Sequence, residues 1–78
     1  MPHIIVKLVP GKSEEQKARL AKAIVEDVMS VLNYEAEAVS VAIEEVARQD
    51  WAEKVYRPEI QGNADSIYVR TGYDPFNS

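Results

Sequence analysis

The first two residues of the chain, Met1 and Pro2, could together supply an unusual base. Initiator methionine is normally removed when a small residue or proline follows it, and its removal would leave the nitrogen of Pro2 as a free secondary amine. An α-amino group titrates at about 7.7–8.0, and burial lowers the pKa of an amine because the charged form loses its water. A base poised near neutrality suits proton transfer in a cell. The alternative is that proline at this position only permits methionine removal.

Few other residues carry chemistry of their own. Lys12 follows the Pro10–Gly11 turn and could reach an anionic substrate, although on composition alone a solvated lysine is the commoner case. Trp51 is the only tryptophan. A tryptophan usually lies in a core or an interface, but this one could also line an apolar pocket. His3 is the only histidine and cannot make a metal site by itself, so we take it as a packing residue. The chain has no cysteine and no glycine-rich phosphate loop, and we expect neither a metal nor a cofactor.

Length and composition limit the class of protein. With 78 residues the chain should form one domain over residues 1–78, and so short a domain leaves much apolar surface uncovered. Since 46% of the residues are hydrophobic, we expect an oligomer that completes its core between subunits. Nine Lys and Arg against thirteen Asp and Glu give a net charge of −4, which argues against a nucleic-acid binder.

The apolar stretches of the chain do not predict a membrane protein. None approaches the length of a membrane span. The N-terminal apolar run is short, contains Lys7 and has no basic residue ahead of it, so it does not have the pattern of a signal peptide. We therefore expect a cytoplasmic protein.

Two apolar segments predict strands that would position the candidate residues. Residues 3–9 are rich in β-branched side chains, and residues 39–44 alternate between apolar and small or polar side chains. Alternation puts Ile4, Val6 and Leu8 on one face of the first strand. Because a helix is predicted between them, the two strands should be parallel and form a β-α-β unit. Such a pair has open edges and an uncovered face, which a second copy of the chain could cover.

The segment between the strands predicts one long helix over about residues 14–32. Ser13 and Gln16 have the spacing of a capping box at its N-terminus, and Asn33 is a residue type that ends helices in the left-handed conformation. An apolar stripe at helical spacing should pack on the strands; it is formed by Leu20, Ala21, Ile24, Val28 and Leu32.

After Val46 the sequence pattern predicts secondary structure less clearly. Asp50 could cap a short helix that reaches Tyr56, with Pro58 limiting its extension. Residues 61–66 read as a polar loop and residues 67–69 as a short strand. The fold class predicted from these elements is α+β.

Taken together, the N-terminal proline, the first strand, the sequence PGKSEEQK leading into a helix and the valine-rich second strand resemble the 4-oxalocrotonate tautomerase family. The resemblance covers roughly residues 2–51, and the later VSVAIEEV, DWAEKVY and TGY segments look like its small dimeric bacterial members. It implies a tautomerase-type β-α-β unit with a short C-terminal helix and strand, completed by oligomerisation as a homodimer or a hexamer. It also implies a cofactor-independent keto–enol tautomerase whose pocket takes residues from a neighbouring subunit.

The resemblance implies roles for particular residues. Pro2 matches the catalytic proline, and Lys12 matches an arginine that binds a substrate carboxylate. Lysine keeps the positive charge but lacks the planar guanidinium with which arginine binds a carboxylate through two hydrogen bonds. Ser40 stands where the best-known members have a second arginine, and a serine cannot supply that charge. Trp51 and Val9 match apolar pocket residues. A small-molecule monoacid such as an aryl enolpyruvate fits one cation and a tryptophan better than a diacid does.

Two other functions remain open at this point. The chain could be a non-catalytic oligomeric module of the same fold, which the mass of the intact protein would indicate if Met1 were still attached. It could also be a hydratase or dehalogenase that uses Pro2, but those reactions need a water-activating carboxylate beside the proline, and the sequence identifies none.

Overall fold

The computed structural model describes residues 1–77. The chain forms two compact units, and the boundary between them along the sequence lies between Glu45 and Val46. The first unit contains strand β1 (His3–Leu8), helix α1 (Glu14–Leu32), the short 3-10 helix η1 (Ala36–Ala38) and strand β2 (Ser40–Glu45). The second contains helix α2 (Arg48–Trp51), which continues as the π-helix η2 (Ala52–Ile60) and the 3-10 helix η3 (Gln61–Ser66).

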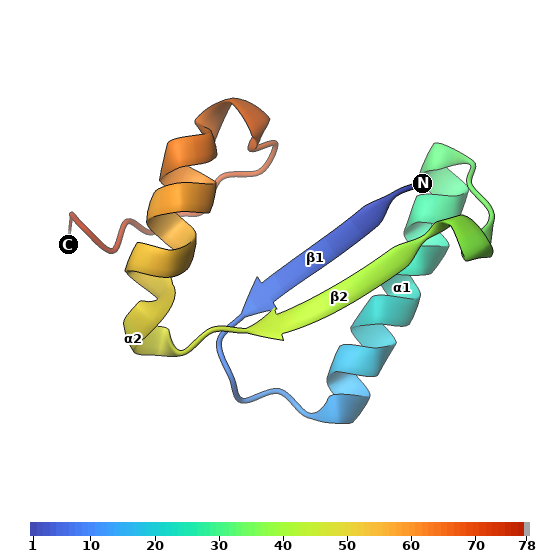
Figure 1. The fold of residues 1–78 in the computed structure, drawn as a ribbon, viewed down its shortest axis with the longest axis horizontal. Coiled ribbons are helices and arrows are strands. Elements are labelled where there is room, and N and C mark those ends of the chain that lie inside the picture. The colour runs from blue at the N-terminus through green and yellow to red at the C-terminus, as the bar shows by residue number, and fades with distance from the viewer. Residues whose placement is uncertain (78) are drawn as a thin grey trace. The chain divides into compact units, whose positions relative to one another are not determined.

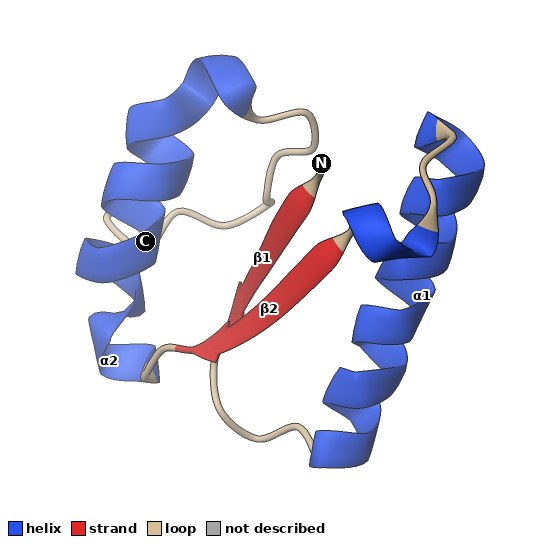
Figure 2. Ribbon diagram, turned by 45° about the vertical axis from the view of Figure 1, so that its right-hand side comes forward, coloured by secondary structure: helices blue, strands red, loops and turns tan. Residues whose placement is uncertain are grey.

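The two strands of the first unit form a parallel pair. His3 lies opposite Ser40 at one end of the pair, and Leu8 lies opposite Glu45 at the other. Helix α1 connects the strands and lies along one face of the pair, as Figures 1 and 2 show. The predicted β-α-β unit with parallel strands, and with it the α+β fold class, is confirmed.

Both ends of α1 follow from single residues. The backbone N–H of Gln16 donates to Ser13 Oγ at 3.0 Å, and the backbone N–H of Ser13 donates to Gln16 Oε1 at 2.9 Å, which completes the predicted capping box. At the other end Asn33 has φ 62° and ends the helix in the left-handed conformation. The predicted bounds of this helix, residues 14–32, are confirmed.

An ion pair identifies the face of the sheet that α1 covers. Lys17 Nζ on α1 lies 3.2 Å from Glu45 Oε2 at the end of β2, and 2.7 Å from Glu14 Oε1. Hydrogen bonds to Glu14 and Glu45 raise the pKa of Lys17. Because side chains alternate along a strand, the face that carries Glu45 also carries the apolar pairs of the sheet; these are Val6 with Ile43 and Ile4 with Val41.

The core of a single chain is small. Among residues 1–77 only Val55, with 5% of its surface exposed, is buried, and it belongs to the second unit. In the first unit several large apolar side chains are exposed, among them Ile5 (49%), Val31 (78%) and Leu32 (56%). A single β-α-β unit therefore does not bury all of its apolar side chains.

The second unit begins differently from the prediction. Its helix begins at Arg48 with Ala47 at the N-cap, and no side chain caps it. The predicted cap at Asp50 is wrong, because the backbone N–H of Asp50 already donates to Ala47 O at 2.9 Å and the residue lies inside the helix. The Asp50 carboxylate instead lies 3.6 Å from Lys54 Nζ, one turn further on.

Pro58 does not end the helix, so that prediction is also wrong. The helix widens to a π-helix over Ala52–Ile60, with Pro58 inside it. Proline removes one backbone donor, and the wider turn is one way in which a helix accommodates an irregular hydrogen-bond pattern. Just beyond, the backbone N–H of Gln61 donates to both Arg57 O and Tyr56 O. A Cβ on Gly62 would lie 2.9 Å from Arg57 O, so the tightening after the π-helix requires a glycine there.

The last predicted elements also differ from the structure. Residues 61–66 form a 3-10 helix rather than a loop, and the backbone N–H of Ile67 donates to Ala64 O at its end. The predicted strand over residues 67–69 is wrong: Tyr68 is 98% exposed, Val69 is 88% exposed, and the sheet has only the strands β1 and β2 within residues 1–77. A β-branched residue type favours a strand only where another strand pairs with it.

Candidate functional site

Pro2 lies at the head of the parallel sheet. Its carbonyl oxygen accepts a hydrogen bond from the backbone N–H of Ser40 at 3.2 Å, which fixes the entry of the chain into β1. Pro2 is half-buried, whereas Met1 is fully exposed at 100%. Removal of Met1 would therefore leave this end of the sheet intact and expose the nitrogen of Pro2.

A histidine and a serine pair beside Pro2. His3 Nδ1 lies 2.7 Å from Ser40 Oγ, since the parallel register places the two residues directly opposite each other. An imidazole can both donate and accept hydrogen bonds. From the sequence alone His3 is expected to be a packing residue, so its contact with Ser40 is not predicted. The signal that could have found it is the register of the two strands, which puts the first residue of β2 next to the first residue of β1.

Lys12 and Val9 lie at the opposite end of β1. Val9 directly follows the strand, and Lys12 is exposed in the turn that leads to α1, after Gly11 with φ 134°. The strand has six residues, so it separates Pro2 from Lys12 by about 20 Å. Figure 1 shows the same separation: the N-terminus lies at one end of β1, and the connection to α1 leaves from the other. Pro2 and Lys12 of one chain cannot both contact one small substrate.

Trp51 belongs to the second unit, where it is the last residue of α2 and half-buried. Its indole N–H donates a hydrogen bond to the Tyr73 hydroxyl at 2.9 Å. Of the site residues predicted from the sequence, the structure thus brings Pro2 and Ser40 together, and it places Val9 and Lys12 at the other end of the sheet.

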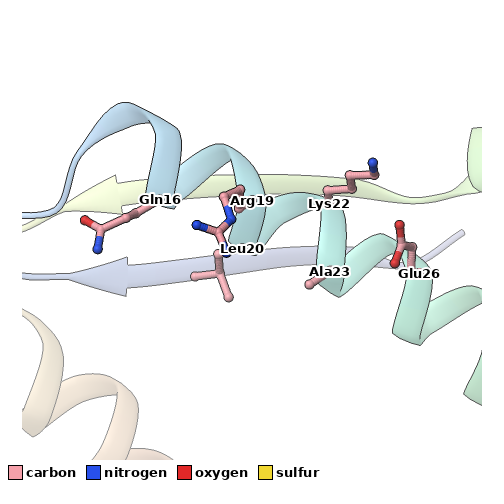
Figure 3. Close-up of a pocket in the computed structure, with 6 residues that line it drawn as sticks. All are labelled: Gln16, Arg19, Leu20, Lys22, Ala23 and Glu26. Atoms are coloured by element: carbon pink, nitrogen blue, oxygen red, sulfur yellow. The ribbon is translucent and has the colours of Figure 1, made fainter.

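One hollow on the first unit does not coincide with these residues. It is an open depression along α1, lined by Gln16, Arg19, Leu20, Lys22, Ala23 and Glu26, which Figure 3 shows along the helix. It contains none of the predicted site residues. Within residues 1–77 no three histidine, aspartate or glutamate side chains are grouped so that they could hold a metal ion. No helix in that range is long and apolar enough to cross a membrane.

A parallel β-α-β unit with a proline at the head of its first strand is the arrangement that the sequence resemblance implies, and comparison with known proteins agrees with it. The family model described as "Tautomerase enzyme" matches residues 2–57. The chain therefore belongs to the tautomerase family, as the resemblance predicted.

Individual relatives are similar over most of the chain. A protein of Xylella fastidiosa (strain 9a5c) named "Probable tautomerase" is 44% identical over 73 residues, which cover 94% of this chain and 89% of that protein. "Tautomerase PptA" of Enterobacter sp. (strain 638) is 35% identical over 94% of this chain and 97% of its own length. Among solved structures, TomN, a 4-oxalocrotonate tautomerase homologue in the tomaymycin biosynthetic pathway, superposes with a TM-score of 0.63 at 34% identity. That match covers 64% of this chain and 77% of TomN.

Proposed function

We propose that the protein is a cofactor-independent keto–enol tautomerase of small 2-keto carboxylic acids, with the amine of Pro2 as its base after removal of Met1. The observation that carries the proposal is the position of Pro2 at the head of β1, held by the hydrogen bond from Ser40. Two further facts support it: Met1 is fully exposed, and the family match begins at residue 2.

The reaction needs one group that can both accept and return a proton. The neutral amine of Pro2 takes the hydroxyl proton of the enol, and the electrons of that O–H bond form the carbonyl. The carbon–carbon double bond of the enol then accepts a proton at C3 from the Pro2 ammonium, which gives the 2-keto acid. The number of protons is unchanged over the cycle, so neither a cofactor nor an external acid is required.

A second copy of the chain completes the site. A two-fold axis between two β1 edges makes the strands antiparallel, so the C-terminal end of one strand meets the N-terminal end of the other. This arrangement brings Lys12 of the partner subunit toward Pro2, which Lys12 of the same chain cannot reach. A single chain also leaves apolar side chains exposed, such as Ile5 and Leu32, which gives a partner subunit apolar surface to bury. We therefore propose a homodimer as the smallest active species, and sedimentation at micromolar concentration distinguishes it from a hexamer or a monomer.

Each remaining site residue has a proposed role. Lys12 of the partner subunit binds the substrate carboxylate. Val9 of the partner subunit, which lies at the same end of β1 as Lys12, excludes water together with Trp51, and both contact an aryl group. Ser40, paired with His3 at 2.7 Å, replaces a second cation with a neutral hydrogen-bonding group. One cation and an aromatic wall favour an aryl enolpyruvate over a diacid.

Ketonisation of phenylenolpyruvate by the Met1-trimmed protein tests the proposal. We expect Pro2→Ala to lower activity while leaving some, because alanine still provides a primary amine. A chain with one extra residue ahead of Pro2 should lose activity, because the proline nitrogen is then an amide. Full activity of the extended chain would contradict the proposal. Failure of the trimmed protein on a panel of aryl and aliphatic enolpyruvates would favour the non-catalytic alternative. The proposed cytoplasmic location is tested separately by cell fractionation.

A further inference from the structure

The segment over residues 71–77, here called the C-terminal tail, has an ordered structure of its own. The Thr71 hydroxyl donates to Tyr73 O at 3.1 Å. The Asp74 carboxylate accepts from the backbone N–H of Phe76 at 2.9 Å, which closes a tight turn. These local bonds fix the separation of Tyr73 and Phe76, so the tail presents two aromatic rings in a defined arrangement.

Both rings contact the π-helix of the same unit. The ring of Tyr56 lies 5.6 Å from that of Tyr73 and 5.8 Å from that of Phe76, between centroids, and meets the latter edge to face. The Arg57 guanidinium lies 4.2 Å from the Phe76 ring centroid, which is a cation–π distance. Two hydrogen bonds to Glu53, of 2.9 and 3.0 Å, hold that guanidinium in place. The tail is therefore attached to the helix at two neighbouring positions.

The third attachment is to Trp51. Its indole N–H donates to the Tyr73 hydroxyl at 2.9 Å. An indole has a single hydrogen-bond donor, so this contact uses the only one that Trp51 possesses. The indole can then offer a ligand only its apolar ring, and Tyr73 determines how that ring is turned.

We propose that the C-terminal tail positions Trp51 through Tyr73, and thereby sets a preference for aryl over aliphatic substrates. This inference rests on the proposed function, in which Trp51 walls the substrate pocket. The family match ends at residue 57, so the tail lies outside the region that the family model describes. Tyr73 is a positioning residue here, because it acts through the indole and not on the reacting atoms.

Tyr73→Phe tests the inference, because it removes the hydroxyl and keeps the ring that contacts Tyr56. Trp51 is the only tryptophan, so the fluorescence of the whole protein reports on it alone. We expect the variant to show a shifted emission and stronger quenching by acrylamide. We also expect KM for phenylenolpyruvate to rise about two- to tenfold, the effect of one net hydrogen bond, while KM for an aliphatic enolpyruvate stays the same. The matched control is Tyr68→Phe, since Tyr68 is 98% exposed and should change neither measurement.

A second variant, Phe76→Leu, loosens the tail at its other attachment and should shift both measurements in the same direction as Tyr73→Phe. Unchanged quenching in Tyr73→Phe would overturn the inference, whatever the activity. An equal loss on aryl and aliphatic substrates would also overturn it, since the tail would then support only the fold. If the wild-type protein is inactive on both substrates, the proposed function and the proposed selectivity fail together, and quenching alone then decides whether Tyr73 holds Trp51.

Discussion

A site shared between two subunits makes a prediction that a site within one chain does not. The perturbation uses two chains with impaired sites: one extended by a residue ahead of Pro2, which blocks the amine, and one carrying Lys12→Ala. The extended chain keeps Lys12, and the Lys12→Ala chain keeps the amine of Pro2. In a mixed dimer, one of the two sites combines the intact Pro2 with the intact Lys12 of the partner subunit.

The expected magnitude follows from the geometry. Strand β1 lies between Pro2 and Lys12, and its six residues place the two about 20 Å apart within one chain. Loss of a charge-assisted hydrogen bond of about 1.5–3 kcal/mol lowers kcat/KM by about 10- to 150-fold, so the parent chains contribute little. Random assembly of equal amounts makes about half of the dimers mixed, each with one intact site, which gives about one quarter of the wild-type activity.

The assay is ketonisation of phenylenolpyruvate after the two chains are unfolded together and refolded. Each variant refolded alone provides the baseline, and native mass spectrometry of the mixed sample shows that mixed dimers form. Lys22→Ala, which removes a cation from the outer side of α1, should leave kcat/KM unchanged. If the mixed sample shows only the average of the two parent activities, Pro2 and Lys12 do not meet across the subunits and the reasoning is refuted.

Three further predictions concern stability. Lys17→Ala should lower the melting temperature; because its ion pairs raise the pKa of Lys17, this contribution is present at neutral pH and disappears as pH rises through the raised pKa. Glu53→Gln should also lower it; because Arg57 lowers the pKa of Glu53, this contribution is present above about pH 4.3 and is lost as pH falls through the lowered pKa. Gly62→Ala should cost about 1–3 kcal/mol in the free energy of unfolding, as for an overpacked site, since its Cβ would meet Arg57 O at 2.9 Å.

Each of these predictions has its own check. The difference in melting temperature between Lys17→Ala and wild type should narrow from pH 7 to about pH 11, and a constant difference would contradict the ion-pair account. In a series toward acidic pH, the melting temperatures of Glu53→Gln and wild type should approach each other. A difference that grows in acid would contradict the ion pair between Glu53 and Arg57. Gly72→Ala is the matched control for Gly62→Ala, because nothing lies within 4 Å of its Cβ position. Equal destabilisation by the two substitutions would refute the steric argument.

Local signals explain why the first unit could be predicted from the sequence. Ser13, Gln16 and Asn33 define both ends of α1 within a few residues, and alternation along β1 indicates which side chains face the helix. A long helix between two apolar segments then leaves the parallel pair as the expected arrangement. The prediction of Pro2 as the base rests on its position in the chain and on the family resemblance, and it needs no knowledge of the contacts that Pro2 makes.

What the sequence could not predict depends on contacts between distant residues. The bond between His3 and Ser40 joins residues 37 positions apart and needs the strand register. The bond between Trp51 and Tyr73 needs the course of the tail over the second unit. Pro58 was expected to limit the helix, because a sequence pattern cannot distinguish a helix that stops from one that widens.

The central claim is that the amine of Pro2 is the catalytic base, and titration of that amine tests it most directly. The measurement follows nitrogen-15-labelled Pro2 by NMR in Met1-trimmed protein, together with the pH dependence of kcat/KM for ketonisation. We predict that Pro2 titrates below the α-amino range of about 7.7–8.0, because partial burial and the ammonium of Lys12 of the partner subunit both disfavour its charged form. The same pKa should define the acidic limb of the rate profile. A Pro2 amine that titrates in the ordinary range, with a rate profile that follows a different group, would contradict the account.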